Sequence, residues 1–213
     1  MSLLALCEAV PLLLGQVLGE PGDVAHHVYF PTEGFILLVA MVDGHAGLEV
    51  GMVGREGMLG AQLALGVAAT PLRALVQGDG KAWRVSAADF RRELARGTAL
   101  RRCLNRYVHV LMSQLTCSAA CLRYHQIGPR LARLLLMSQD RAYASHFRVT
   151  QEFLGCMLGV RRVGVTAAAG RLQSSGLIEY HRGAMTVLDR PGLEAAACGC
   201  YAANQRVYAS LLT

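Results

Sequence analysis

Two adjacent arginines, Arg161 and Arg162, offer the clearest chemistry in this chain of 213 residues. A guanidinium group stays charged and donates paired hydrogen bonds to phosphate oxygens or to O6 and N7 of guanine. Val163, Thr166 and Ala167 lie within the next five positions and offer methyl groups, which suit the methyl group of thymine. We expect these side chains to share an outward face without an acidic residue, which is typical of a surface that reads DNA.

Two short helices must position these side chains. Leu154 and Leu158 mark one face of the first helix, and Thr150 is its expected N-cap. After Gly159 the apolar period restarts in a second helix, Arg161–Ser174. Helices joined by so short a turn cross steeply, as in a helix-turn-helix, and the start of the second helix then enters the major groove. The expected DNA contacts are Thr150, Gln151, Arg161, Arg162, Val163, Thr166 and Ala167. An ordinary helical hairpin inside a larger core is the alternative interpretation.

The residues after this pair of helices favour a wing. An apolar run begins at Leu177–Ile178, Arg182-Gly183 makes a turn, and a second strand follows at Met185–Leu188. A two-stranded ribbon after a helix-turn-helix predicts a winged helix.

A longer pattern of residues, which spans both helices and the wing, resembles one particular family of proteins. It is Thr150…Leu154-Gly155…Leu158-Gly159-Val160-Arg161-Arg162…Val165-Thr166…Leu172…Gly176-Leu177-Ile178…Gly183…Leu188-Asp189-Arg190, which resembles the DNA-binding domain of the Crp/Fnr superfamily of bacterial transcription regulators. The resemblance implies an α+β fold with an N-terminal cyclic-nucleotide-binding-like β-barrel (jelly roll), a long dimerisation helix and a C-terminal winged helix-turn-helix. We expect these parts at residues 1–97, 98–127 and 128–213. The implied function is a homodimeric, cytoplasmic regulator of transcription that binds a palindromic site on double-stranded DNA. RNA polymerase is a further partner that the resemblance allows, and the effector is unknown.

The chain departs from the family at residues that read bases and ligands. Many relatives present an Arg-Glu pair and a second Arg four residues after the Glu, whereas this chain has Arg162, Val163 and Ala167. Arg162 is therefore expected to specify one G·C pair, and Arg161 to grip phosphate. In the barrel, Met58 stands where cyclic-nucleotide binders have the ribose-binding Glu, and Arg73 matches their phosphate-binding Arg only approximately. We expect no cyclic-nucleotide activation.

Charge is divided unevenly along the chain. The net charge is +6, but residues 1–96 contribute −3 and residues 97–213 contribute +9. A basic second half indicates a polyanionic partner. No apolar run reaches 18 residues, so we expect no transmembrane helix. Residues 1–18 are expected to form a folded helix and not a signal peptide, because they contain Glu8 and Pro11 and lack a basic start.

No pattern in the chain predicts an enzyme, since neither a nucleophile with its base, nor a phosphate loop, nor a carboxylate pair is recognisable. The alternative to a DNA-binding regulator is an interaction module whose helix-turn-helix packs on a protein and whose barrel holds a small ligand. Salt separates the two, because phosphate-driven binding weakens steeply with ionic strength.

Further strands and helices are expected in the rest of the chain. Short strands are expected at Val24–Phe30, Phe35–Val42, Leu48–Val53, Leu72–Gln77 and Ala82–Val85, and a short helix at Ala88–Leu94. A heptad seam in the following helix predicts a dimer interface made of Leu104, Val108, Leu111, Leu115, Ser118 and Leu122. Gly128-Pro129 is expected to break this helix, Arg130–Arg141 to form another, and Pro191–Tyr208 to be a helical tail that closes the wing.

Seven cysteines occur without a CxxC pair, which indicates reduced thiols. The cysteine cluster of iron–sulfur members is absent, because Cys7 stands alone near the N-terminus, so we expect no cluster. Cys117, Cys121 and His125 share one helix face and could bind a metal, but we expect them to be packing groups. The sequence therefore predicts neither a metal nor another cofactor.

Overall fold

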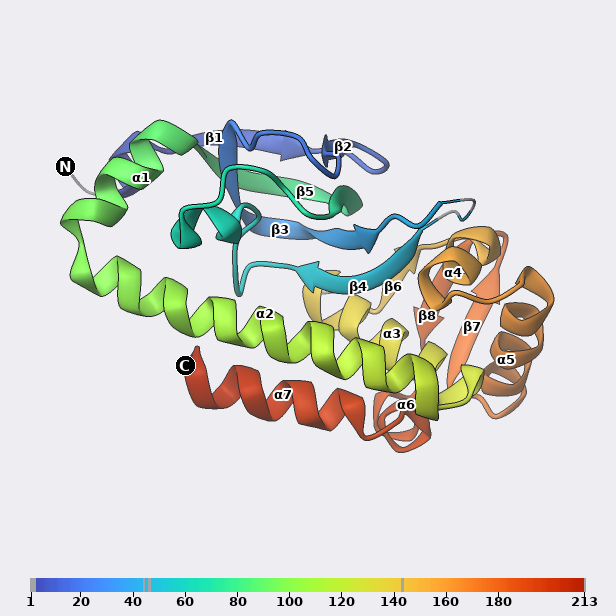
Figure 1. The fold of residues 1–213 in the computed structure, drawn as a ribbon. Helices are drawn as coiled ribbons and strands as arrows, with labels where there is room; N and C mark the ends of the chain where they lie inside the picture. Colours follow the sequence, from blue (N-terminus) through green and yellow to red (C-terminus); the bar gives the residue numbers. More distant parts are fainter. Residues whose placement is uncertain (1–2, 44, 46, 143, 213) are drawn as a thin grey trace.

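The computed structural model describes residues 3–43, 45, 47–142 and 144–212, in which a β-rich first half leads through one long helix to a mostly helical second half (Figure 1). The first half contains β1 (Glu8–Leu12), β2 (Val17–Gly19), β3 (His27–Ala40), β4 (Leu48–Val53) and β5 (Arg73–Ser86), with short 3-10 turns at Leu3–Leu6 and Ala61–Leu65. Its antiparallel sheet has the order β1-β5-β3-β4, and β2 also pairs with β5. We call residues 3–86 the β-domain.

Two long strands replace four of the predicted short ones. Pro31, Gly34 and Gly78 were expected to separate strands, but they lie inside β3 and β5, where the pairing register shifts. Gly34 has a φ of 73°, and a Cβ there would collide with the carbonyl of Gly78. Such residues form bulges that bend a strand without ending it. The prediction of separate strands was wrong for this reason.

The expected N-terminal helix was also wrong. Within the described residues a single 3-10 turn is followed by β1 and β2, and Met1 and Ser2 lie outside them. β1 is an edge strand in which Pro11 faces Lys81. An edge strand tolerates proline, because the missing N–H costs no ladder hydrogen bond on the open side.

Helices α1 (Ala87–Arg96) and α2 (Thr98–Tyr124) connect the β-domain to the second half. Ser86 caps α1 by accepting a hydrogen bond from the Asp89 N–H at 3.1 Å. α2 ends before Gly128-Pro129, and α3 (Ile127–Ala142) already contains this pair in its first turn. Proline needs no N–H partner in a first turn, so the break falls at residues 125–126 and the predicted break was three residues late.

The second half contains a three-stranded sheet and four more helices. Its elements are β6 (His146–Arg148), α4 (Gln151–Leu158), α5 (Arg162–Ser174), β7 (Ile178–His181), β8 (Ala184–Val187), α6 (Arg190–Ala196) and α7 (Cys200–Leu211). The sheet order is β6-β8-β7, so the predicted two-stranded wing gains β6, which is too short to recognise by alternation. The predicted tail is two helices: α6 packs against α3 and shares the core with the wing strands, whereas α7 lies beside α2 (Figure 1).

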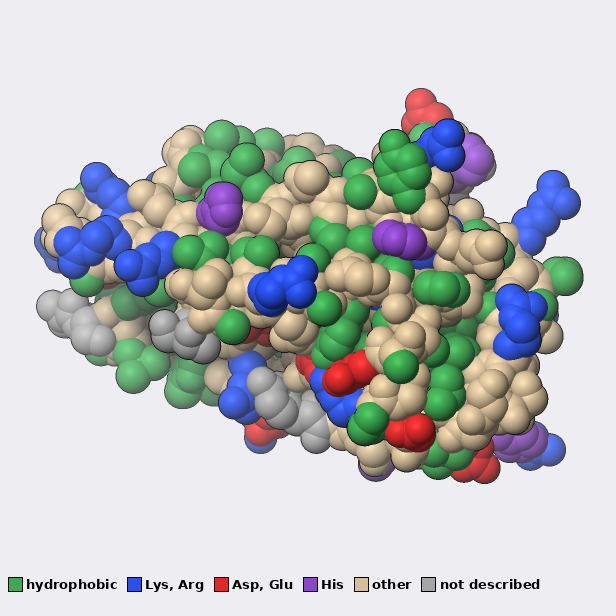
Figure 2. All heavy atoms as spheres, turned by 90° about the horizontal axis from the view of Figure 1, so that it is seen from below, with side chains coloured by type: hydrophobic (Ala, Val, Ile, Leu, Met, Phe, Trp, Pro, Cys, Tyr) green, Lys and Arg blue, Asp and Glu red, His purple; other side chains and the backbone are tan. Residues whose placement is uncertain are grey.

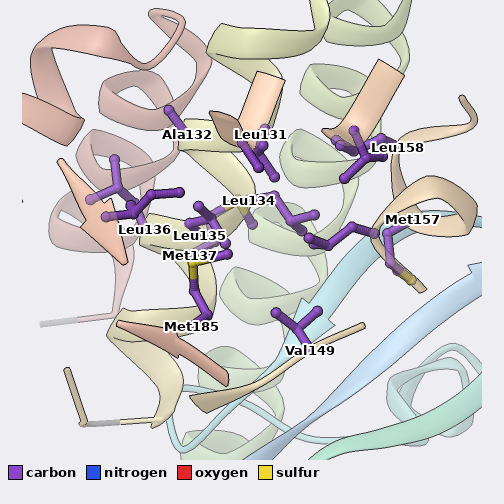
Figure 3. Packing of buried hydrophobic residues seen from close by; sticks show 14 of the residues in the cluster. Leu131, Ala132, Leu134, Leu135, Leu136, Met137, Val149, Met157, Leu158 and Met185 are labelled. Atoms are coloured by element: carbon purple, nitrogen blue, oxygen red, sulfur yellow. The ribbon is translucent and has the colours of Figure 1, made fainter. Parts of the chain in front are cut away.

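Helix α3 is the centre of the largest hydrophobic core. Figure 3 shows its side chains spreading in several directions, with Met137 near Met185 of the wing and Leu131 on the side of Leu158. The same cluster includes Phe35 and Met52 of the β-domain. One continuous core therefore joins the β-domain to the second half. None of the described helices combines the length and hydropathy that a membrane span requires.

Candidate nucleic-acid interface

Helices α4 and α5 form the predicted helix-turn-helix. Thr150 caps α4 by accepting a hydrogen bond from the Phe153 N–H at 3.1 Å, and Gly159 ends the helix with a φ of 61°. A Cβ on Gly155 would lie 3.0 Å from the carbonyl oxygen of Val160, so only glycine fits this close approach comfortably. The close crossing of α4 and α5 therefore depends on Gly155 and Gly159, the small residues on which the sequence prediction relied.

The first two turns of α5 present the predicted reading face to solvent. Arg161, Arg162, Val163, Thr166 and Ala167 are all exposed, and Val163 is 79% exposed. The opposite face packs inward through Val165, Ala168, Ala169 and Leu172, which are buried. Neither arginine forms an ion pair with a carboxylate among the residues that the structure describes. Two unneutralised cations and an exposed apolar side chain therefore share one helix end.

Gln151 links the two helices at this face. Its side-chain oxygen accepts a hydrogen bond from the Thr166 hydroxyl at 2.9 Å and a longer one from Nε of Arg162 at 3.4 Å. These contacts hold Arg162 and Thr166 in one orientation while leaving the terminal guanidinium nitrogens of Arg162 available. Three of the seven residues predicted to bind DNA are thus hydrogen-bonded together on the surface.

The wing adds a cation that the sequence analysis treated only as a turn residue. Arg182 and Gly183 have φ values of 49° and 83° and form the two-residue connection between β7 and β8. Arg182 lines a groove with Thr150, Gln151 and Arg162. A non-glycine residue at positive φ is uncommon and often marks a functional position. An Arg-Gly turn following an apolar strand was the signal that could have identified it.

Tyr180 supports the wing against the first helix of the pair. Its hydroxyl donates a hydrogen bond to the carbonyl of Val149 at 2.8 Å. Burial raises the pKa of Tyr180, although the nearby charge of Arg162 opposes the shift, so the hydroxyl remains a donor at neutral pH. The wing and the start of α4 are therefore tied by a bond that does not titrate near neutrality.

A buried polar network connects this unit to the β-domain. Arg141 of α3 pairs with Glu56 at 2.9 Å and donates a hydrogen bond to the hydroxyl of Tyr208 at 2.9 Å. The same hydroxyl accepts from Gln114 of α2 at 3.1 Å, and Gln114 in turn accepts from the Met52 N–H at 3.0 Å. The β-domain, α2, α3 and α7 thus meet in one hydrogen-bonded chain. Charged pairs this far apart in sequence carry no local signal, so the sequence analysis missed them.

The residues of α2 that were predicted to form a dimer interface differ in their exposure to solvent. Leu104 and Ser118 are buried within the chain, and Ser118 accepts a hydrogen bond from Arg133 at 3.0 Å. Leu115 is exposed, while Val108, Leu111 and Leu122 are half-buried. Met112 and Ala119 are also exposed and complete a stripe with 4-3-4-3 spacing: Val108, Met112, Leu115, Ala119 and Leu122. We call these five residues the α2 stripe.

Figure 2 shows the side of α2 and α7 from below, with basic side chains at both ends and near the middle, and hydrophobic ones scattered between them.

In the β-domain, the residues at the two expected ligand positions, Met58 and Arg73, contact the protein's own residues. Met58 is 1% exposed, and its backbone carbonyl accepts a hydrogen bond from Tyr107 of α2 at 3.1 Å. A Cβ on Gly57 would collide with the Tyr107 ring, so α2 lies directly against this loop. Arg73 pairs with Glu20 at 2.8 Å. Neither a ribose acceptor nor an unpaired phosphate-binding arginine stands at these two positions.

Comparisons with known proteins agree with this geometry. Residues 129–196 match the family of Crp-like helix-turn-helix domains. The full sequence has no match among curated proteins.

Solved structures extend the likeness to the whole chain. FixK2 from Bradyrhizobium japonicum is 14% identical, with a TM-score of 0.76 over 90% of this chain and 98% of that one. A CRP-family transcriptional regulator from Thermus thermophilus is 19% identical, with a TM-score of 0.70 over 96% and 98%. The c-di-GMP-responsive global regulator CLP from Xanthomonas campestris is 18% identical, with a TM-score of 0.66 over 86% and 95%. The three share the fold of this chain.

Proposed function

We propose that this chain, which has the Crp/Fnr regulator fold and a Crp-like helix-turn-helix domain, is a homodimeric, sequence-specific DNA-binding regulator of transcription in the cytoplasm. The observation that carries the proposal is the exposed start of α5, where Arg161 and Arg162 lie without an acidic partner among the described residues beside the solvated Val163. Two guanidinium groups without a neighbouring carboxylate favour the binding of phosphate and of guanine. The exposed Val163 side chain contributes hydrophobic free energy only when another apolar group covers it.

The α2 stripe supports the dimer. Leu115 and Met112 are large apolar side chains, 36% and 60% exposed, at the 4-3-4-3 spacing that a second helix covers in a coiled coil. Leu104 and Ser118 of the predicted seam contribute inside the chain instead. Leu115→Asp should therefore dissociate the dimer, because it buries a charge at the centre of the interface. Ala120→Asp is the matched control, because Ala120 is exposed on α2 outside the stripe. An unchanged dimer in sedimentation equilibrium of Leu115→Asp would refute the interface.

The proposed signal is not a cyclic nucleotide. Support comes from Met58, which is part of the hydrophobic core, and from Arg73, whose charge is taken up by Glu20. Calorimetric titration of the protein with cyclic AMP and with cyclic GMP should give no saturable heat. Micromolar binding of either nucleotide would show that the β-domain has another route to the ribose and phosphate.

Selection of bound sequences from random duplexes tests the function itself. A dimer that places two copies of α5 in successive major grooves should select an inverted repeat with half-sites about 34 Å apart. The logarithm of the binding constant should fall linearly with the logarithm of salt concentration. If no sequence is enriched, or if binding to the enriched duplex does not depend on salt, the proposal fails and the protein-interaction alternative gains support.

A further inference from the structure

Four potential metal ligands converge where α2 ends and α7 begins. Cys121 and His125 are one turn apart at the end of α2, Cys198 lies in the connection between α6 and α7, and Cys200 is the first residue of α7. The Sγ atoms of Cys121 and Cys198 are 3.5 Å apart, and the Sγ of Cys200 is 3.6 Å from Nδ1 of His125. All four ligand atoms lie within 4.8 Å of one another.

These separations suit a tetrahedral site. With metal–sulfur bonds of about 2.3 Å, two sulfurs of a tetrahedral zinc site lie roughly 3.8 Å apart, and a sulfur and a nitrogen slightly less. The two observed separations, 3.5 Å and 3.6 Å, are within a few tenths of an ångström of those values. The ligands therefore need only small movements to bind one ion, and three sulfurs with one imidazole fill its coordination sphere.

The backbone already fixes both ligand pairs. The His125 N–H donates to the carbonyl of Cys121 at 3.1 Å, and the Cys198 N–H donates to the carbonyl of Pro129 in α3 at 3.3 Å. The thiol of Cys117, one turn before Cys121, reaches the carbonyl of Cys200 at 3.7 Å. Cys117 therefore supports the loop and is not itself a member of the cluster.

Simple packing explains only half of the cluster. Cys121 and Cys198 are buried and would serve as small apolar groups. His125 and Cys200 are half-buried and gain no comparable packing, yet their ligand atoms point to the same place.

The buried charges nearby also fit a metal–thiolate centre. Arg130 and Arg133 are 8% and 5% exposed, and within the described part of the chain neither has a carboxylate at ion-pair distance. Both interact electrostatically with Cys121, and Nε of Arg133 has no hydrogen-bond partner. Three thiolates and one divalent ion carry a net charge of −1, which would offset this excess of positive charge.

We propose that Cys121, His125, Cys198 and Cys200 bind one Zn²⁺-class ion in a closed, structural site that ties the end of α2 to the start of α7. The proposal rests on these four residues and is independent of the proposed DNA binding. Because Cys198 is bonded to the first turn of α3, the ion would also fix the junction at which the helix-turn-helix unit leaves α2.

The test uses the full chain purified under reducing conditions without chelator. Elemental analysis should find about one zinc per chain that survives dialysis, as expected for a site with four protein ligands. Replacement by Co²⁺ should give the intense sulfur-to-cobalt charge-transfer and d–d bands of a tetrahedral thiolate site. His125→Gln and Cys200→Ser should weaken zinc binding by more than the roughly 10–100-fold typical of changes outside the ligand set.

Two controls make the test decisive. Cys103→Ser alters an exposed cysteine on the same helix, and it should retain zinc and the cobalt bands. Because ligand variants can lose stability, the wild-type protein also supplies a readout: zinc should protect three thiols from alkylation, and mass spectrometry should place them at positions 121, 198 and 200. Zinc absent from reduced and reconstituted protein, binding unaffected by Cys200→Ser, or a disulfide between Cys121 and Cys198 that persists in the presence of reductant and zinc would each overturn the proposal.

Discussion

Two positions at which the chain departs in the same way from the Crp/Fnr pattern that its sequence resembles lie in opposite surroundings. Met58 in the β-domain and Val163 on α5 both stand where that pattern implies a glutamate that contacts a ligand. Met58 is 1% exposed and belongs to the core under α2, whereas Val163 is 79% exposed beside two arginines that lack a carboxylate partner among the described residues. One of these positions therefore holds a residue that stabilises the fold, and the other holds a residue that the fold does not use.

This difference in exposure indicates that the residues at these positions stabilise the fold in the β-domain and face solvent at the helix-turn-helix. In the β-domain the residues at these expected ligand positions stabilise the structure, since Met58 packs inside and Arg73 pairs with Glu20. At the helix-turn-helix the changed residues remain on the surface and can alter only what the surface contacts. Substitutions at Met58 and Arg73 should therefore change the free energy of unfolding. Substitutions on the exposed face of α5 should change the affinity for DNA.

The largest effect is expected when the acid is restored inside the β-domain. Met58→Glu should lower the free energy of unfolding by about 3–5 kcal/mol, because it buries a charge without a partner. Urea denaturation measures this value, and Met58→Leu, which keeps the volume and polarity, should cost less than about 1.5 kcal/mol. If Met58→Glu is as stable as the wild type and binds cyclic AMP, the distinction between the two regions collapses.

On the DNA-binding side, the two arginines should differ. Arg162→Ala should cost roughly 1–3 kcal/mol of binding and relax preference at one base pair, because Arg162 is oriented by Gln151 and can fork onto guanine. Arg161→Ala should weaken all sequences alike and lower the salt slope by about one. Binding of both variants to single-base variants of the selected site decides the assignment. Loss of preference at one position only in Arg161→Ala would show that the roles are reversed.

Local patterns predicted the parts of the molecule that local physics determines. The helix-turn-helix followed from Gly155, Gly159 and a short apolar period, and α4 and α5 have nearly the expected limits. α1 and β4 were likewise predicted close to their observed limits, because a capping serine marks the start of α1 and apolar residues at alternate positions, Leu48, Val50 and Met52, mark β4. Their signals lie within one or two turns of the chain.

Contacts between distant segments escaped prediction. The buried face of α2 includes Tyr107, Val110 and Gln114 because the β-domain and α7 lie there, and no periodicity within α2 reveals which stripe its own chain will cover. The seam inferred from leucine spacing therefore mixed buried and exposed positions. The convergence of Cys121 with Cys198 depends in the same way on α7 folding back beside α2.

A buried acid lies next to the core that joins the β-domain to the second half. Glu49 in β4 is 5% exposed, and burial raises its pKa despite the opposing charges of Arg133, Arg141 and Arg130. The folded protein thus holds this proton at pH values where the unfolded chain has released it. Stability should fall as pH rises from the ordinary value of 4.5 through the raised pKa.

Glu49→Gln should remove that contribution to the pH dependence, which urea unfolding at several pH values measures. Glu179→Gln is the matched control, because Glu179 is an exposed acid on a strand and makes the same change of charge in contact with solvent. A slope that is identical in wild type and Glu49→Gln would show that Glu49 does not carry the effect.

The smallest change in folding is expected where the acid is restored on the recognition helix. Val163→Glu should alter the free energy of unfolding by less than about 0.5 kcal/mol, because the side chain is 79% exposed and has only solvent to displace. Its effect should appear in sequence preference. Glutamate accepts a hydrogen bond from N4 of cytosine, so the position beside the guanine read by Arg162 should shift from an A·T preference toward cytosine, by about 1 kcal/mol. Val163→Gln removes the charge while keeping the shape and separates base reading from repulsion by phosphate. Selection from random duplexes with each variant measures both. If Val163→Glu unfolds the protein, or leaves the selected sequence unchanged while Met58→Glu is tolerated, then the family's two glutamate positions do not divide between structure and recognition in this chain.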